Sequence, residues 1–328
     1  MRRHAGRSVV VVAAILVAAA LSAAGAGFTV GDASAVATAM KAGRFVVSRF
    51  PLHAGPVAVA TAGGSVWVVV ETRRRGTELW KLDRNSGKRL ARFTIGRSGP
   101  DFGAIAVGEG VVWAAAGDHL IGVDMSGLCT VRRTSVPGQA ATVTSGFGSV
   151  WVATIGQQRN LISRLNSATL AVQSRIRIAD QPIALHAGMG SVWLATNTSL
   201  SSIKPANDRI VPAAVLPEEP QGLAFSAAHL WLLQRLELVT KIDRGGRGGA
   251  QVRLPFSPGS AAVSAARIWV TDNCACMKGT LALIDLQTRR LVGEQRIGET
   301  PVGVAADPVE AWVITFGDAT LTRVRLSK

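Results

Sequence analysis

The chain has 328 residues, of which 48% are hydrophobic and 17% are charged, and its formal net charge is +15. The hydrophobic content is enough for a substantial core, and this composition excludes a disordered protein. The length fits one large all-β domain or two ordinary domains, so it leaves the number of domains open.

The first forty residues read as a targeting segment. Arginines at positions 2, 3 and 7 precede Val9 to Ala24, a run of apolar and small residues in which Ser22 is the one polar member. This run is short for a membrane-spanning helix, which needs about 20 residues. Two small-residue triplets, Ala24 to Ala26 and Ala33 to Ala35, fit a signal-peptidase site. A cleaved signal peptide is therefore predicted, with an uncleaved N-terminal anchor helix as the alternative.

Both alternatives place the body of the protein outside the cytoplasm, either secreted or tethered to the membrane. The predicted organisation is a signal peptide or anchor over residues 1–26, a linker over 27–42 and one repeat domain over 43–328. The chain has three cysteines, too few for the framework of a disulfide-rich exported domain.

Self-similarity is the strongest pattern in the chain. Seven of the eight tryptophans occur in a shared context of the GSVWVA type, at intervals of 38 to 46 residues. In each unit a short strand of small apolar residues and a tight turn precede the tryptophan strand, and two more short strands follow. Four such strands make one blade of a β-propeller. The seven repeat tryptophans are Trp67, Trp113, Trp151, Trp193, Trp231, Trp269 and Trp312.

Details of each unit agree with a propeller blade. Small residues in the first strand suit the crowded central axis, and the tryptophan ring suits the gap between neighbouring blades. Acids after the third strand, such as Asp83 and Asp285, are interpreted as turn residues that accept hydrogen bonds from backbone amides. Turns that begin the units are predicted at Gly55–Pro56, Gly99–Pro100, Gln181–Pro182, Pro220–Gln221, Pro258–Gly259 and Thr300–Pro301.

The two ends of the repeat region complement each other. The last unit stops after its third strand, Leu321 to Leu326, and an extra strand, Arg44 to Phe50, precedes the first unit. Pairing of these segments would close the ring, whereas an open solenoid of the same repeat would leave strand edges exposed. The sequence therefore predicts an all-β, seven-bladed β-propeller of four-stranded antiparallel blades, preceded by the signal or anchor helix.

The repeat resembles that of the YVTN/YncE-like, streptogramin-lyase-like (Vgb-like) propeller superfamily over residues 43 to 328. This resemblance implies the fold and leaves the function open, because enzymes, ligand binders and assembly platforms share the scaffold. In the lyases a histidine follows the Gly-Pro turn and a glutamate follows the tryptophan strand, with a divalent metal. Here Val57 follows Gly55–Pro56, and Glu71 is the one acid near the second position, without an evident histidine partner.

Loops between the second and third strands are expected to share one face with the connections between blades. They depart most from the repeat, so this face is the predicted binding face. The loop of blade 1, expected over Glu71 to Glu78, carries three arginines that are either solvated or suited to a phosphate or carboxylate. The candidate ligand-binding residues are Arg73, Arg74, Arg75, His119, Arg159, Asp272 and Lys278.

The corresponding loop of blade 6 contains Cys274 and Cys276. These two residues could form a local disulfide, stay as free thiols, or hold a soft metal ion with help from Asp272 or Met277. The spacing lacks the further ligands that a zinc site needs. Cys129 is expected on the opposite face, so its pairing with either is not expected, and no metal or other cofactor is predicted.

The charge of the chain favours anionic partners. Without residues 1–26 the chain loses three of its 36 cationic residues and keeps its 21 acids, which leaves a formal charge of +12. Anionic wall polymers, lipid headgroups and acidic proteins fit an exported protein, and nucleic acid is a less favoured partner. The predicted function is a non-enzymatic extracytoplasmic binding or scaffold protein that contacts an anionic ligand or protein. The alternative is a propeller lyase or hydrolase at the mouth of the central channel, which needs histidine and carboxylate groups from neighbouring blades.

Overall fold

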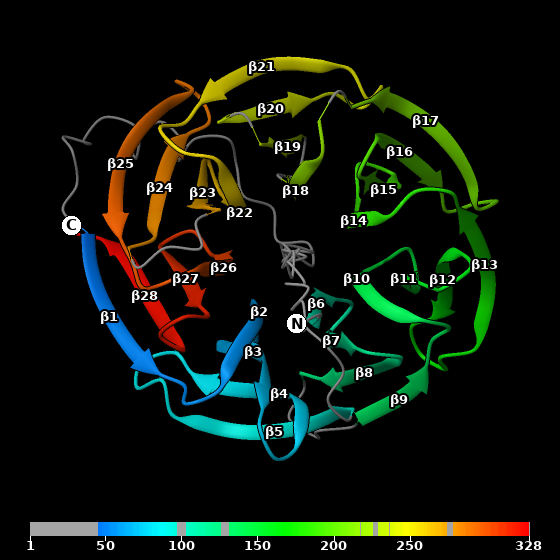
Figure 1. The fold of residues 1–328 in the computed structure, drawn as a ribbon, viewed down its shortest axis with the longest axis horizontal. Helices are drawn as coiled ribbons and strands as arrows, with labels where there is room; N and C mark the ends of the chain where they lie inside the picture. The colour runs from blue at the N-terminus through cyan, green and yellow to red at the C-terminus, as the bar shows by residue number, and fades with distance from the viewer. Residues whose placement is uncertain are drawn as a thin grey trace, which may run out of the picture.

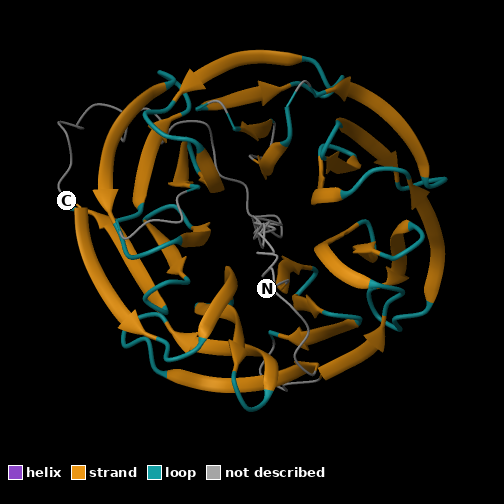
Figure 2. Cartoon of the chain, in the orientation of Figure 1, coloured by secondary structure: helices purple, strands orange, loops and turns teal. Residues whose placement is uncertain are grey.

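The computed structural model describes residues 45–96, 103–125, 131–216, 218–225, 229–235, 237–273 and 278–327. Figures 1 and 2 show seven small sheets arranged as a ring around a central axis, and every regular element of the described residues is a strand. The predicted signal segment and linker, residues 1–42, lie outside the described residues. The described residues include no helix with the length and apolar character that a membrane crossing needs.

Each blade is one antiparallel sheet of four strands, and in blades 1 to 6 the strands run in chain order from the axis outward. Blade 1 has β2 (Gly55–Ala62), β3 (Ser65–Thr72), β4 (Gly76–Asp83) and β5 (Arg89–Gly96). Blade 2 has β6 (Gly103–Gly108), β7 (Val111–Ala116), β8 (His119–Asp124) and β9 (Val131–Ser135). Blade 3 has β10 (Gln139–Gly146), β11 (Ser149–Ile155), β12 (Asn160–Asn166) and β13 (Val172–Ile178).

Blades 4 to 6 follow the same plan. Blade 4 has β14 (Pro182–Gly188), β15 (Ser191–Thr196), β16 (Ser199–Lys204) and β17 (Arg209–Val215). Blade 5 has β18 (Pro220–Phe225), β19 (Leu230–Gln234), β20 (Leu238–Ile242) and β21 (Gly248–Arg253). Blade 6 has β22 (Pro258–Ser264), β23 (Arg267–Asp272), β24 (Thr280–Asp285) and β25 (Arg290–Arg296).

Blade 7 is built from both ends of the repeat region. It contains β26 (Pro301–Ala306), β27 (Glu310–Thr315), β28 (Thr320–Leu326) and, as its outermost strand, β1 (Phe45–Pro51). The β1–β28 register pairs Phe45 with Leu326 and Pro51 with Thr320. The predicted pairing of these two segments is therefore confirmed, and β2 of blade 1 also contacts β26 of blade 7.

The first strands begin earlier than the sequence predicted. Five of the predicted turn prolines are instead among the first two residues of an innermost strand, and the ladder shifts register directly after each of them. Proline is tolerated there because the start of an edge strand and a β-bulge both avoid the need for its missing N–H donor. These prolines are Pro56, Pro182, Pro220, Pro258 and Pro301.

Turn aspartates have the predicted role. Asp83 Oδ1 accepts hydrogen bonds from the backbone N–H groups of Asn85 and Ser86, and Asp285 Oδ1 accepts from those of Gln287 and Thr288. These acids stabilise local turns, as Asx turns commonly do.

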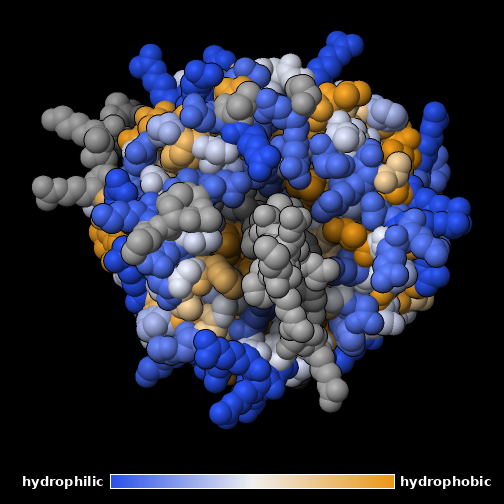
Figure 3. All heavy atoms as spheres, viewed as in Figure 1, coloured by the Kyte–Doolittle hydropathy of each residue, from blue (hydrophilic) through white to orange (hydrophobic). Residues whose placement is uncertain are grey.

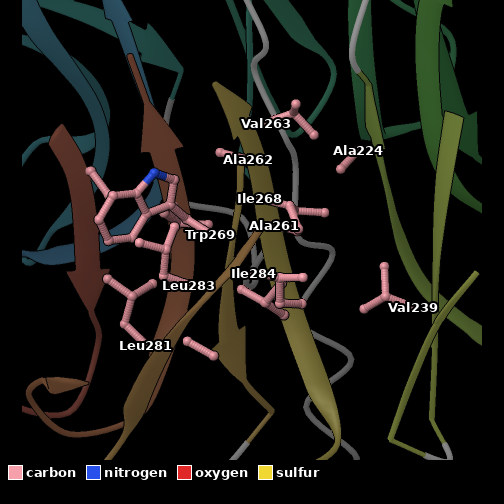
Figure 4. Packing of buried hydrophobic residues seen from close by; sticks show 14 of the residues in the cluster. Ala224, Val239, Ala261, Ala262, Val263, Ile268, Trp269, Leu281, Leu283 and Ile284 are labelled. Atoms are coloured by element: carbon pink, nitrogen blue, oxygen red, sulfur yellow. The ribbon is translucent and has the colours of Figure 1, made fainter. Parts of the chain in front are cut away.

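The repeat tryptophans fill the gaps between blades, as predicted. All seven are buried, and each packs with apolar residues of the following blade; Trp67, for example, lies in one cluster with Ile105 and Val112 of blade 2. Figure 4 shows Trp269 and Leu283 on one side of the blade 6 sheet, while Ile268 and Ile284 lie on the other side, toward blade 5. Each sheet therefore buries both of its faces against its neighbours.

A charged cluster on one face fastens blade 7 to blade 1. Glu310 is 1% exposed and accepts hydrogen bonds from Nε1 of Trp312 at 3.0 Å, from Nε of Arg323 at 2.5 Å and from Nε of Arg84 at 3.1 Å. Arg84 comes from blade 1 and also pairs with Asp307 of blade 7. One buried carboxylate therefore serves two arginines and one indole at the junction where the ring closes.

We predict that Glu310→Gln lowers the free energy of unfolding by about 3 kcal/mol, because it leaves two partly buried guanidiniums without their shared counter-charge. Urea unfolding followed by tryptophan fluorescence measures this change. Glu294→Gln is the matched control, since Glu294 is an exposed acid on the outer strand β25. Equal unfolding midpoints for the two variants would show that the cluster does not fasten the junction.

Candidate functional site

The three neighbouring arginines of blade 1 occupy a tight turn. The ladder between β3 and β4 continues to the pair Thr72 and Gly76, so only Arg73, Arg74 and Arg75 lie in the connection. The longer loop predicted over residues 71–78 is therefore wrong: most of it extends the two strands. Thr72 Oγ1 accepts from the N–H of Arg75 at 3.1 Å and donates to the carbonyl of Gly76 at 2.9 Å. Gly76 has a φ of 80°, the left-handed conformation that ends such a three-residue hairpin.

A cavity of about 960 Å³ lies beside this turn, at the junction of blades 7 and 1, and we call it the seam cavity. Its walls come from the arginine hairpin, the blade 7 turn at Phe316 and Ala319, and the connection from β1 to β2. The N–H of Leu52 in that connection donates to the carbonyl of Ala319 at 2.8 Å, which ties two of the walls together. The seam cavity is lined by Leu52, His53, Ala54, Gly55, Glu71, Thr72, Arg73, Arg74, Arg75, Gly76, Thr77, Glu78, Trp80, Arg89, Arg92, Phe316 and Ala319.

The seam cavity is strongly cationic. Besides the three hairpin arginines, Arg89 and Arg92 reach it from the outer strand β5, and all five are exposed. Two lining residues are acids, Glu71 and Glu78. Figure 1 shows the β3–β4 hairpin projecting at the lower edge of the ring, and Figure 3 shows strongly hydrophilic side chains gathered at the same place. Five guanidiniums around one opening raise the local concentration of anions.

Trp80 forms an apolar and aromatic part of this site. Its Nε1 donates to Oε2 of the buried Glu78 at 2.7 Å, and the guanidinium carbon of Arg89 lies 4.5 Å from the centre of its ring. This is the eighth tryptophan, on the third strand of its blade and outside the repeat context. It fixes Arg89 over an aromatic face, a favourable arrangement for a guanidinium.

Sequence reasoning found the hairpin arginines and missed the rest of the seam cavity. Arg89 and Arg92 lie on an outer strand, where an exposed arginine is ordinary, and Phe316 comes from the other end of the domain. The available signal was Trp80, because it is the one tryptophan of the chain outside the repeat context.

The other predicted site residues lie on different blades. Arg159, together with Arg177, lines a second cavity of about 650 Å³ on blade 3. Lys278 is an exposed residue just before β24 on blade 6. The structure therefore does not gather the predicted set into one pocket, and the arginines of blade 1 and blade 3 line two separate cavities.

His119 and Asp118 form an ion pair on the predicted binding face. Nδ1 of His119 lies 2.5 Å from Oδ1 of Asp118, and both side chains are about half exposed, at 49% and 62%. His119 begins β8, the third strand from the axis, and packs beside Gly96 of blade 1. This pair is therefore made by sequence neighbours away from the channel mouth, and it receives no acid or base from a neighbouring blade among the described contacts.

Asp272 is a buried acid at the end of β23. Its Oδ2 accepts from the N–H of Thr280 at 2.9 Å, while Oδ1 has no hydrogen-bond partner within the described part of the chain. Burial raises the pKa of Asp272 to about 6, although the hydrogen bond from Thr280 acts in the opposite direction.

Cys129, Cys274 and Cys276, with Met277, lie outside the described residues, so the local disulfide stays a prediction. Among the described residues, no three histidine, cysteine or acidic side chains gather in a geometry that could hold a metal ion.

No family model matches the chain, and no curated protein matches it. Among solved structures, the β-propeller domain of Cps50 (Swd1) from Myceliophteria thermophila is similar at a TM-score of 0.68 and 9% identity, covering 85% of this chain and 100% of that domain. Hydrazine synthase from Kuenenia stuttgartiensis is similar at a TM-score of 0.68 and 13% identity, covering 92% of this chain and 99% of the other. At these identities the likeness shows the propeller fold alone.

We predict that Asp272→Asn stabilises the protein at pH 7.5 by about 2 kcal/mol and has little effect near pH 4. The folded-state pKa of about 6 exceeds the usual 3.8, so folding is favoured most while Asp272 is protonated, and this contribution is lost as the pH rises through 6. Asparagine keeps an acceptor for the Thr280 N–H and removes the buried charge. Urea midpoints measured from pH 4 to 7.5 test this, with Glu294→Gln as control; a variant that parallels the wild type throughout would contradict it.

Proposed function

We propose that this chain is a non-enzymatic extracytoplasmic binding protein that takes an anionic ligand, or the anionic group of a protein partner, in the seam cavity. The observation that carries the proposal is the convergence of five arginines from one hairpin and one outer strand on a single cavity of about 960 Å³. The blade 3 cavity is smaller, at about 650 Å³, and is lined by two arginines, Arg159 and Arg177.

The chemistry of the lining favours phosphate or carboxylate groups. Guanidinium donors form bidentate, charge-assisted hydrogen bonds with both anions. Hydrogen bonds to charged groups contribute about 1.5 to 3 kcal/mol each, so each of them can raise the affinity for an anion about tenfold or more. Hydrogen bonds of Thr72 hold the backbone of the hairpin turn, and Trp80 holds the side chain of Arg89, so this part of the ordering precedes binding.

The extracytoplasmic location rests on the sequence of residues 2–26, with a basic start and an apolar run. Outside the cytoplasm, wall polymers and lipid headgroups supply phosphate in quantity, and they are the partners we favour. Membership of the YVTN/YncE-like, streptogramin-lyase-like superfamily stays a prediction from the repeat. The lyase alternative needs a histidine and a carboxylate from neighbouring blades, whereas His119 and its partner Asp118 are sequence neighbours on one blade.

We predict that replacing Arg73, Arg74 and Arg75 by alanine weakens binding to isolated wall polymer or to anionic vesicles at least tenfold, about 1.4 kcal/mol or more. Titration of the purified chain against each probe and against duplex DNA, at rising salt, measures the change. The substitutions lie in a turn whose hydrogen bonds come from Thr72 and Gly76, so the fold should be preserved.

The matched control is Arg209→Ala, Arg253→Ala and Arg290→Ala, which removes three exposed arginines from the outer strands of blades 4 to 6. Both triple variants lower the net charge equally. If they weaken binding equally, the attraction is a property of the net charge and the proposed site is wrong.

A further inference from the structure

The outermost strands of blades 1, 2 and 3 carry more positive charge than those of the other blades. Each of β5, β9 and β13 contains two arginines and no acid. By contrast β1, β17 and β21 contain one arginine each, and β25 contains two arginines with one glutamate. We call the six residues of blades 1 to 3 the rim arginines: Arg89, Arg92, Arg132, Arg133, Arg175 and Arg177.

Protection of a strand edge explains one charged residue per strand, but it does not explain this asymmetry. All outer strands of the ring face the same need to avoid edge-to-edge pairing. A net charge of one per strand meets this need on β1, β17, β21 and β25, so the second charge on each of the three consecutive strands has another cause.

The rim arginines form a continuous track across the blade junctions. Nη1 of Arg133 on blade 2 donates to the carbonyl of Thr94 on blade 1 at 2.5 Å. Nη1 of Arg132 donates in the other direction, to the carbonyl of Ser167 on blade 3 at 3.2 Å. The two side chains of β9 thus bridge both gaps, and Figure 1 shows β5, β9 and β13 end to end along the outer edge of the ring.

Both ends of this track open into cavities. Arg89 and Arg92 belong at once to β5 and to the seam cavity. At the other end Arg177 of β13 lines the blade 3 cavity of about 650 Å³ together with the exposed Arg159. Ten arginines therefore lie along one path when Arg73, Arg74 and Arg75 are added.

We propose that the ligand is a linear, flexible polymer of phosphate groups that enters the seam cavity and lies along the rim of blades 1 to 3. This rests on the proposed function for its first contact, and adds the chemical class and the path of the ligand. Phosphate oxygens accept from the rim arginines, and also from the unpaired backbone N–H groups of the outer strand edges.

The path favours a flexible polymer over a duplex. Three of seven blades cover a large arc of a small disc, and bending a stiff DNA duplex, whose persistence length is about 150 base pairs, around such an arc would cost several kcal/mol. It also favours a polymer without bases, because binding of single-stranded nucleic acid uses exposed aromatic rings as stacking platforms. The one aromatic residue on these three strands, Phe93, is partly buried and stacks on Trp67 with 6.3 Å between ring centres.

The test uses the full chain and inorganic polyphosphate of about 50 phosphates, compared with tripolyphosphate, in titrations at several salt concentrations. Tripolyphosphate is too short to extend from the seam cavity along the rim, so the long chain should bind at least tenfold more tightly per molecule. Arg175→Gln with Arg177→Gln should weaken the long chain about tenfold and leave tripolyphosphate unchanged. The slope of log K against log salt should fall by about 1.4, the value expected for two lost phosphate contacts of a single strand.

The matched control is Arg209→Gln with Arg290→Gln, which removes two exposed arginines from outer strands of blades 4 and 6. An equal loss in this control would overturn the proposal. A long chain that binds no more tightly than tripolyphosphate would also overturn it, while leaving the proposed function intact. Binding of neither probe would contradict both. Tighter binding of a single-stranded oligodeoxynucleotide with the same number of phosphates would show that bases are recognised and that the ligand class is wrong.

Discussion

Packing of an indole ring between adjacent blades is the interaction on which the rest of this structure depends. A four-stranded sheet of this size cannot bury its two faces alone, and each repeat tryptophan completes the contact with the next blade. Seven sheets therefore need seven junctions. Six of them join consecutive blades, and the seventh brings Trp312 of blade 7 against Val59 and Val66 of blade 1.

That seventh junction is where the chain departs most from its repeat. On one face Glu310 joins Arg84 and Arg323, and on the other Glu78 and Trp80 support an arginine-lined cavity. The two ends of the domain meet here, so residues far apart in sequence become neighbours that no repeat rule constrains. A ring held by the other six junctions can place special side chains at this one without losing its fold, which is a physical reason for a binding site to lie here.

The spacing of the tryptophans predicted the blade number, and the strand pattern within each unit predicted the strand order, because both follow from a local pattern repeated seven times. The pairing of β1 with β28 was predicted because the last unit lacks a fourth strand and an extra strand precedes the first unit. The seam cavity could not be predicted in the same way, since Phe316, the β1–β2 connection and Arg92 converge only when the ring has closed. The hairpin was expected to be a long loop, because Gly76 and Thr77 were not recognised as the continuation of a strand. Trp80 could be recognised in the sequence as a tryptophan outside the repeat. Its role in the seam cavity, however, depends on its hydrogen bond to the buried Glu78.

The net charge of the chain and the positions of its charges have different effects on ligand binding. A net charge of +15 raises attraction to any anion, and by itself it selects none. Selection requires that charges be held at fixed spacing. Here consecutive outer strands of the ring present pairs of arginines, and the pair on β9 bridges to both neighbouring blades. Each exposed guanidinium contributes little alone, because solvent and salt screen it. A long polyanion that touches many of them in one binding event gains from their number, whereas a small ion gains only from the seam cavity. The arrangement of charge on this propeller thus favours ligands by length as well as by sign.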